Sequence, residues 1–177
     1  KPNGAVYRYE YDSINRLTKT FFKENASSGE VILNEIDYSI MANGHMQISF
    51  TEYLSDSLKF TKIIEKDYAN REVMIQYPDY GRSMIYYNPD GTVQQEMAVN
   101  GAITYYDYDK LGNMTVCMKP ICIADGNTMF SLTTYTYDQA GNLLSKKTAK
   151  SLIPKAEDGI DLNAYANQVF ATEDAYT

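Results

Sequence analysis

The chain has 177 residues, of which 44% are hydrophobic and 22% are charged, as is usual for a globular chain long enough to bury a sizeable core. Its net charge of -7 argues against binding to nucleic acid or to an anionic membrane surface, because both interactions draw on clustered Lys and Arg. No apolar run approaches the roughly 18 residues of a membrane-spanning helix. We therefore expect no nucleic acid partner and no membrane insertion of this segment.

In the first part of the chain, turn signals alternate with β-rich stretches. Clusters of Gly, Asn, Asp and Ser, which favour turns, cover residues 25–30, 42–44 and 55–57. The β-rich stretches cover residues 31–40, 46–54 and 59–66. Tyrosine, which has a high strand propensity, occurs 17 times in the whole chain, and Trp is absent.

From residue 70 to residue 112, turn signals recur about every ten residues, a spacing typical of an all-β meander. The strongest two-residue hairpin signal is Asn100-Gly101. No stretch before residue 148 shows the apolar period of a capped helix. The sequence therefore predicts an all-β fold, an antiparallel meander of about ten to twelve strands in a strongly curled sheet or a barrel.

The C-terminal part of the chain differs from the rest. Pro154 breaks the preceding strand, and Ala and Asp become more frequent. A short helix over residues 161–170 would place Leu162, Tyr165, Val169 and Phe170 on one face. We expect a meander domain at residues 1–149 and a tail at residues 150–177, which is either irregular or a short helix that caps the sheet.

Three phrases of the chain are nearly the same: YEYDSINRL at residues 9–17, YDYDKLGNM at 106–114 and YTYDQAGNL at 135–143. The two Tyr of each phrase share one face of a strand, because side chains alternate with period two. The Asp can hold backbone N–H groups, and the Gly or Asn three residues later accepts the positive φ of a tight hairpin. Each phrase therefore predicts a strand, a turn and a return strand.

A structural role in this repeated hairpin is predicted for Tyr9, Tyr11, Asp12, Tyr106, Tyr108, Asp109, Gly112, Tyr135, Tyr137, Asp138 and Gly141. Looser copies of the phrase occur at residues 77–82 and 87–93, and residues 67–71 echo residues 12–16.

The phrases resemble the YD repeat of the RHS family, whose pattern is Tyr-x-Tyr-Asp-x-x-Gly-Arg/Asn-Leu. The three good copies cover about a sixth of the chain, and the degenerate copies extend the resemblance over about its central two-thirds. The copies are few and irregularly spaced, and Asn15 stands where the family has Gly.

The resemblance implies a bacterial protein that is extracellular, at the cell surface or periplasmic. In this family YD repeats form spiralling β-sheets that are not catalytic and are sometimes linked to carbohydrate binding. We expect a small surface or periplasmic protein rather than a shell that encloses a toxin, because so few strands enclose little.

No catalytic constellation stands out in the sequence. His45 is the single histidine, and nothing around it resembles a nucleophile elbow or a papain-type segment. We interpret it as a polar residue at a hairpin rim. The 23 Asp and Glu make carboxylate pairs easy to find and therefore uninformative about glycoside hydrolysis. We expect no catalytic residue and no enzyme.

No metal site or cofactor is expected, with bound calcium as an alternative. Two groups of oxygen ligands have a spacing that can hold Ca²⁺: Asp107, Asp109 and Asn113, and Asp158, Asp161 and Asn163. Cys117 and Cys122 lie five apart on an expected strand, on opposite faces, so we expect two free thiols.

If consecutive hairpins stack, the six motif tyrosines lie on one face of the sheet. We expect this face to pack as the core, because aromatic residues pair favourably across strands. The opposite face could then offer an aromatic platform for sugar rings. Its candidate ligand-binding residues are Tyr86, Tyr105, Asp107 and Arg82.

Together these observations predict a non-enzymatic structural or interaction module of a bacterial secreted or envelope protein. The alternative is a carbohydrate-binding module that uses exposed tyrosines, and the second alternative is a carboxylate-based hydrolase. The expected partner is a protein or a glycan at the cell envelope.

Overall fold

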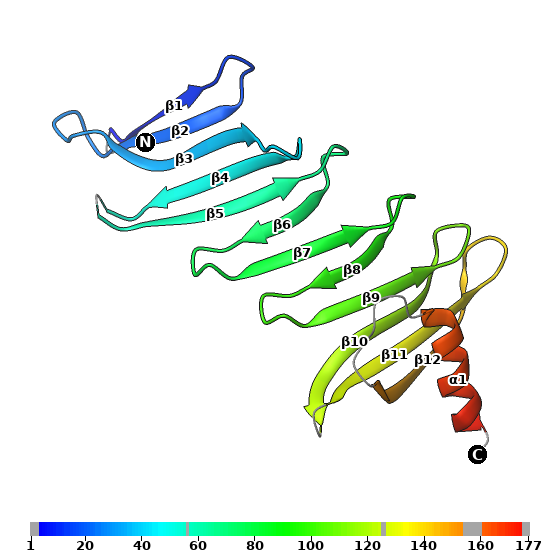
Figure 1. Ribbon diagram of the computed structural model, residues 1–177. Helices are drawn as coiled ribbons and strands as arrows, with labels where there is room; N and C mark the ends of the chain where they lie inside the picture. The colour runs from blue at the N-terminus through cyan, green and yellow to red at the C-terminus, as the bar shows by residue number, and fades with distance from the viewer. Residues whose placement is uncertain (1–3, 56, 125–126, 154–160, 175–177) are drawn as a thin grey trace. The chain divides into compact units, whose positions relative to one another are not determined.

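In the part of the chain that the structure describes, twelve antiparallel strands follow one another in one meander sheet, and a single helix follows them (Figure 1). The structure is a computed structural model that describes residues 4–55, 57–124, 127–153 and 161–174. The elements are β1 (Val6–Tyr11), β2 (Leu17–Lys23), β3 (Val31–Ile40), β4 (Met46–Tyr53), β5 (Lys59–Lys66), β6 (Glu72–Gln76), β7 (Arg82–Tyr87), β8 (Val93–Met97), β9 (Ile103–Tyr108), β10 (Met114–Ala124), β11 (Asn127–Tyr137), β12 (Leu143–Ile153) and α1 (Leu162–Asp174).

The all-β meander predicted from the sequence is confirmed, and of the two alternatives for the tail the structure shows the short helix. Closure into a barrel or strong curling is not confirmed, because β1 and β12 stand at the two ends of the strand order. Within the described part of the chain, no helix is long and apolar enough to cross a membrane.

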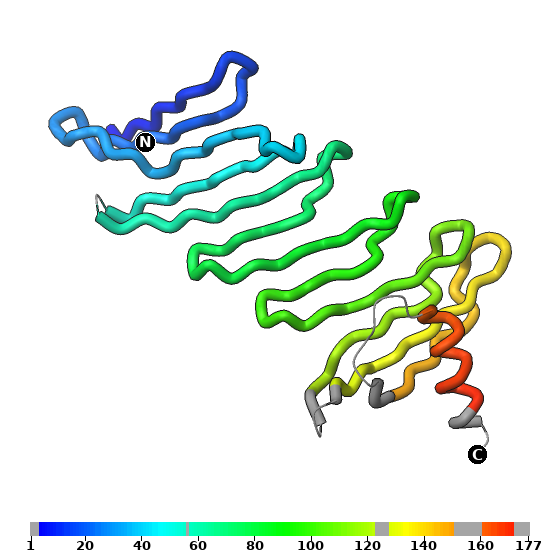
Figure 2. Tube along the Cα trace, in the orientation of Figure 1, coloured from blue at the N-terminus to red at the C-terminus, as the bar shows by residue number. Residues whose placement is uncertain are grey.

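By its internal contacts the chain divides into two units, residues 1–84 and residues 85–177. In the second unit, the turn at residues 109–113 and the turn at residues 138–142 lie at the same edge of the sheet (Figure 2). The expected division into a meander at residues 1–149 and a tail at residues 150–177 is not tested by this grouping and stays a prediction.

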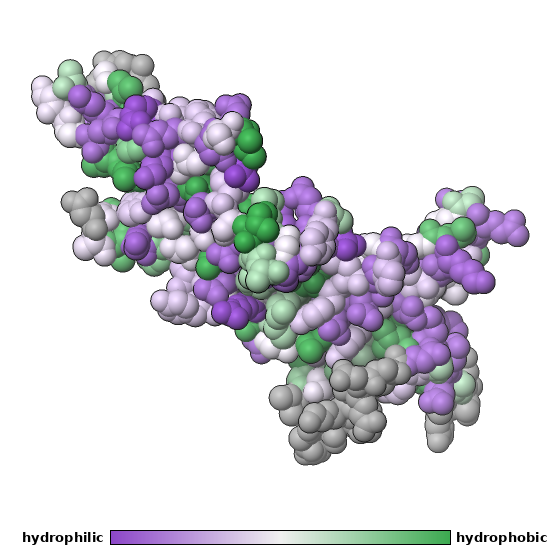
Figure 3. All heavy atoms as spheres, turned by 45° about the horizontal axis from the view of Figure 1, so that its top comes forward, coloured by the Kyte–Doolittle hydropathy of each residue, from purple (hydrophilic) through white to green (hydrophobic). Residues whose placement is uncertain are grey.

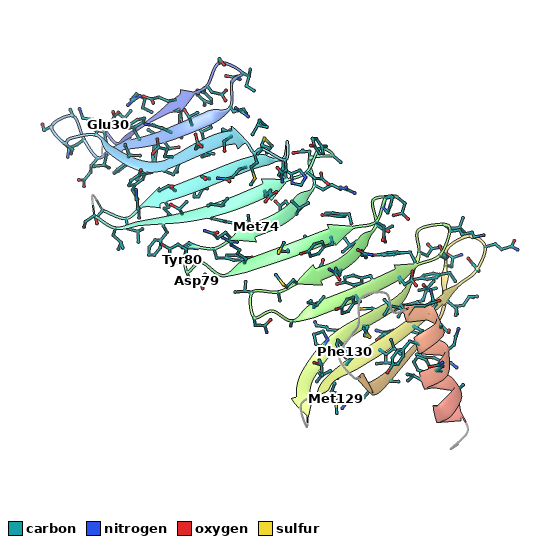
Figure 4. The ribbon with its side chains drawn as sticks, in the orientation of Figure 1. Glu30, Met74, Asp79, Tyr80, Met129 and Phe130 are labelled. Atoms are coloured by element: carbon teal, nitrogen blue, oxygen red, sulfur yellow. The ribbon has the colours of Figure 1, made fainter. Side chains whose placement is uncertain are left out.

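The core of the second unit forms between α1 and one face of β9–β12. Buried side chains on this face are Val116, Met118, Phe130 and Leu132, which α1 meets with Leu162 and Ala166. Phe130, labelled in Figure 4, is 5% exposed. The predicted apolar face of the helix is confirmed, because Leu162 is buried and Tyr165, Val169 and Phe170 pack against this cluster.

The first residues of α1 are held by the chain itself. The Oδ1 atom of Asp161 accepts the N–H of Ala164 at 2.9 Å, which is a helix N-cap. Asn163 Nδ2 donates to Asp107 Oδ2 on β9, and so ties the helix to the sheet. The helix extends to Asp174, four residues beyond the predicted end.

In the first unit, the two faces of the sheet differ in polarity. Cross-strand pairs such as Ile36 with Phe50 and Ile48 with Ile64 line one face and are half-buried. The other face carries polar contacts such as Lys19 with Glu35, at 3.0 Å. The fully buried hydrophobic residues among those described all belong to the second unit. Figure 3 shows hydrophilic and hydrophobic side chains interspersed over the visible side.

Eight of the described hairpins share one five-residue turn, at residues 12–16, 41–45, 67–71, 77–81, 88–92, 98–102, 109–113 and 138–142. In each turn the N–H of the first residue donates to the carbonyl of the fifth, and the N–H of the fourth donates to the carbonyl of the first. The fourth residue always has a positive φ. This geometry is a type I turn followed by a left-handed residue, which forms a β-bulge.

Tyr80 is the exception at the fourth position. Gly or Asn fills that position in the other seven turns, whereas Tyr80 adopts a φ of 65° and is 82% exposed. Figure 4 shows Tyr80 beside Asp79 at the turn between β6 and β7. A Cβ in this conformation is strained by about 1–2 kcal/mol, and the exposed ring offers little packing in return.

We predict that Tyr80→Gly raises the free energy of unfolding by about 1 kcal/mol, because glycine adopts a positive φ without a Cβ clash. Urea denaturation of the whole chain measures the change. The control is Tyr80→Ala, which removes the ring but keeps the Cβ and should give no gain. Equal stabilisation by both variants would assign the effect to the ring and contradict the strain at the backbone.

Candidate functional site

The repeated Asp of the motif is the hydrogen-bond centre of its turn. Asp109 Oδ1 accepts the N–H groups of Leu111 and Asn113 at 2.8 and 2.9 Å, and Asp109 Oδ2 accepts the side-chain Nδ2 of Asn113 at 2.9 Å. Asp138 makes the same three bonds, to Ala140 and Asn142. The motif therefore requires a side-chain donor at the fifth position, which explains its Asn or Arg.

Arg and Asn perform the same task in different turns. Arg16 Nε donates to Asp12 Oδ2 at 2.6 Å, and Arg71 Nε donates to Asp67 Oδ2 at 2.8 Å. Both of these turns have Asn at the left-handed fourth position, whereas the two turns with Asn at the fifth position have Gly there. The sequence pattern indicated the Asp and the Gly, but not this bond between the side chains.

The remaining four turns reach the same result from the third position. The side-chain oxygens of Asn43, Asp79, Asp90 and Asn100 accept the N–H of the residue two places later, at 2.9–3.1 Å. In all eight turns, therefore, a side-chain oxygen of Asp or Asn binds the N–H of the fifth residue. The sequence analysis did not identify the hydrogen-bonding role of the third position. Its signal is an Asp or Asn directly before a Gly, as in three of these turns, or two residues before a Gly, as at Asp79.

The motif tyrosines do not form the predicted core. Tyr9 and Tyr11 are 50% and 55% exposed, and in the second unit Tyr106 is paired with Cys117 on the face opposite Val116 and Met118. Tyr108, Tyr135 and Tyr137 are half-buried on that same face by strand alternation. The prediction was wrong because the apolar residues of β10 and β11 alternate onto the other face, where α1 covers them.

The four candidate ligand-binding residues have different surroundings. Tyr105 is partly buried against the core under α1, and Asp107 accepts the side chain of Asn163 on that helix. Tyr86 is 39% exposed on β7, and Arg82 Nε donates to Gln76 at 3.0 Å. Arg82 belongs to the first unit and the other three to the second. Their role in ligand binding stays a prediction.

A hollow of about 480 Å³ lies on the helix side of the sheet in the second unit. Ile103, Pro120 and Phe130 contribute apolar walls, Tyr105 an aromatic ring, and the turn at Asn100 a polar rim. Its volume is in the usual range for a small-molecule site, about 300–1,000 Å³.

His45 lies at the rim of the hairpin between β3 and β4, and its Nδ1 is 2.7 Å from Glu65 Oε1. The His45 ring meets the Tyr68 ring edge to face, and the Tyr68 hydroxyl donates to the carbonyl of Asn43. Gly44 has a φ of 79°, and the Tyr68 ring occupies the space where a Cβ would stand. The cluster therefore joins the β3–β4 turn to the β5–β6 turn.

The described residues among those proposed for calcium are already engaged in the fold. Asp109 and Asn113 bond to each other, Asp107 to Asn163, and Asp161 to the start of α1. Asp158 lies outside the described residues. Among the residues that the structure describes, no group of three or more His, Cys, Asp or Glu is arranged to hold a metal ion.

Cys117 and Cys122 are free thiols, as the spacing predicted. Burial raises the pKa of the Cys117 thiol above its ordinary value. Since the thiolate is the reactive form, Cys117 is a poor nucleophile at neutral pH.

Comparison with known proteins gives no family assignment. No family model matches the chain. No curated protein matches it either. A crystal structure of TcdB2-TccC3-TEV matches at 11% identity and a TM-score of 0.33, over 82% of this chain and 10% of that chain.

Two further structures match in the same way. A crystal structure of TcdB2-TccC3 without its hypervariable C-terminal region has 11% identity and a TM-score of 0.34, over 82% of this chain and 10% of that one. A Tc holotoxin pore from Photorhabdus luminescens has 11% identity and a TM-score of 0.29, with the same coverage. The chain spans about a tenth of the length of these structures, and likeness at such scores carries no argument about function.

We predict that Asn142→Ala lowers the melting temperature by about 2–4 °C, because Asp138 Oδ2 loses its side-chain donor. Asn142→Arg should retain the wild-type melting temperature, because Arg16 and Arg71 supply the same donor in their turns. Thermal unfolding followed by circular dichroism measures both variants. Equal losses in the two variants would contradict a requirement for a donor at this position.

Acid should destabilise the fold through the motif carboxylates. The pKa of Asp109 and of Asp138 is lowered from 3.8, chiefly by the Asn side chain that each accepts, and the pKa of Asp67 is lowered chiefly by Arg71. A lowered pKa in the folded state means that the stabilisation is complete above 3.8 and is lost as the pH falls through the folded values. Urea midpoints measured from neutral pH downward should fall in that window. The matched variant Asp109→Asn should show a shallower fall, and an unchanged slope would contradict the assignment.

Proposed function

We propose that the chain is a non-enzymatic structural or interaction module of a bacterial protein that is secreted or belongs to the envelope. The observation that carries this proposal is the use of the repeated motif. Its Asp, its left-handed residue and its fifth side chain are all engaged in the turn that each copy builds. Because the repeated residues stabilise their own turns, their repetition supports a scaffold rather than a reaction centre.

The proposed location, architecture and partner of the protein are supported by the resemblance to YD repeats alone. That resemblance supports an extracellular, cell-surface or periplasmic location, and a curled sheet or barrel as the finished architecture. An envelope protein or glycan is the partner that it suggests.

The carbohydrate-binding alternative has one observation in its favour. Tyr105, a candidate ligand-binding residue, lines the hollow of about 480 Å³ beside Asn100. The same ring packs against the core, however, so its loss affects folding as well as any ligand.

Turnover separates the proposal from the hydrolase alternative. We expect the purified chain to hydrolyse none of a panel of chromogenic glycosides, esters and peptides above the buffer rate. The pair His45 and Glu65 is the arrangement that a hydrolase could use. Turnover that is abolished by Glu65→Gln, in a variant that still melts like the wild type, would overturn the non-enzymatic assignment.

We predict that Tyr105→Ala lowers the free energy of unfolding by about 1–3 kcal/mol, because the ring packs against the core. Urea denaturation measures this loss, and Tyr105→Phe is the control that keeps the packing. A glycan array probed with wild type and Tyr105→Phe tests the binding role separately. A saturable glycan signal that Tyr105→Phe weakens without loss of stability would favour the carbohydrate-binding alternative.

A further inference from the structure

Positive charge is concentrated on three neighbouring strands of the second unit. β10, β11 and β12 carry four lysines and no Asp or Glu. The whole chain has 23 Asp and Glu and a net charge of -7. The basic surface therefore results from where the lysines lie in the sheet and not from the overall composition of the chain.

Three of these lysines share the face of the sheet that α1 does not cover. Lys119 is paired with Ser131, and Ser131 is paired with Lys150. Paired residues project to the same face, so Lys119 and Lys150 stand two strands apart, or about 10 Å. Lys146 lies on the same face four residues before Lys150, about 13 Å along the strand. All three lysines are exposed.

Tyrosines and hydroxyl groups fill the space around these lysines. Tyr135 is paired with Lys146, whose Nζ is 5.8 Å from the centre of its ring. Thr133 and Thr148 are paired and share a hydrogen bond of 3.1 Å between their Oγ1 atoms. The face is thus hydroxylated and positively charged.

Cys117, paired with Thr133, lies on the same face as the three lysines. Lys119 and Lys146 both lower the pKa of Cys117, although burial has the larger, opposite effect. Glu96, on β8, is the acid that opposes them there, and its carboxylate accepts the Tyr106 hydroxyl at 2.9 Å.

We propose that this lysine–tyrosine face (Lys119, Lys146, Lys150 and Tyr135) binds an acidic segment of a partner protein. The inference rests on the proposed interaction role and names the chemistry of the partner. Three separated ammonium groups match a few carboxylates, and tyrosine is enriched at protein interfaces because its ring is apolar and its hydroxyl is polar.

The size of the face favours a short acidic segment over a long polyanion. The lysines span about 10 by 13 Å, so nucleic acid or an acidic polysaccharide would run beyond them onto a chain with a net charge of -7. Repulsion there would offset the attraction of three lysines. A compact acidic segment can lie over β10–β12 alone, which carry no Asp or Glu and of which β10 is two strands from Glu96 on β8.

The experiment is a fluorescence anisotropy titration of the full chain with a fluorescein-labelled dodecapeptide of alternating glutamate and serine. The matched probe has glutamine in place of glutamate. The test variant is Lys119→Glu with Lys150→Glu. The control variant is Lys110→Glu with Lys147→Glu, which makes the same change in net charge at exposed lysines that lie on a turn and on the opposite face.

We expect the glutamate probe to bind and the glutamine probe to bind at least about tenfold more weakly. The test variant should weaken binding about tenfold, the control less than about twofold, and added salt should weaken the wild-type complex. Equal weakening by both variants would overturn the proposal, because only net charge would then matter. Absence of binding by the wild type would overturn it as well.

Heparin and single-stranded DNA serve as competing probes. If either binds the wild type more tightly than the acidic peptide does, and the test variant abolishes that binding, the face recognises long polyanions and the proposal is wrong. Thermal unfolding tests whether both variants fold. A variant that does not fold is replaced by one with Lys→Gln at the same positions. If the acidic peptide does not bind selectively, this inference is wrong but the proposed structural role is unaffected. Turnover in the hydrolysis panel, in contrast, would contradict the proposed function itself.

Discussion

The bond between a side-chain oxygen and the N–H of the fifth turn residue underlies eight hairpins of the meander. Each of the eight five-residue turns places a left-handed residue fourth, and the bulge that follows displaces the fifth residue from regular pairing. Asp at the first position or Asx at the third accepts its N–H. Because the turn sets the register of the two strands it joins, this local bond decides which residues face which side of the sheet.

The two units differ in how deeply the apolar face of the sheet is buried. In the second unit the apolar residues of β10 and β11 gather on the face that α1 covers, and full burial follows. In the first unit the apolar face carries cross-strand pairs that stay half-buried. A single layer of strands can bury its side chains only against a second layer. The helix therefore supplies the second layer against which the apolar face of the sheet forms a core.

The strand number, the turns and the apolar face of the helix could be predicted from the sequence, because period-two alternation, Asx-Gly chemistry and helical spacing are local signals. The choice of core face could not, since it depends on register shifts such as the one between Thr136 and Tyr137, which occur beside some turns and not others. The burial of Tyr105 and the engagement of Asp107 depend on where the distant helix lies. The lysine face required the register of three strands, which brings Lys119 and Lys150 together across Ser131.

The strand order has a consequence for how the chain reaches its fold. Every described strand pair joins neighbours in the sequence, so each closure spans one short loop. All-β proteins usually fold slowly because their pairings join distant parts of the chain, but topology and not strand content sets that rate. A meander of self-sufficient hairpins can begin to order at any turn and extend in both directions, as repeat proteins do. Within the described part of the chain, the docking of α1 on β9, β10 and β11 adds contacts that reach back over several strands.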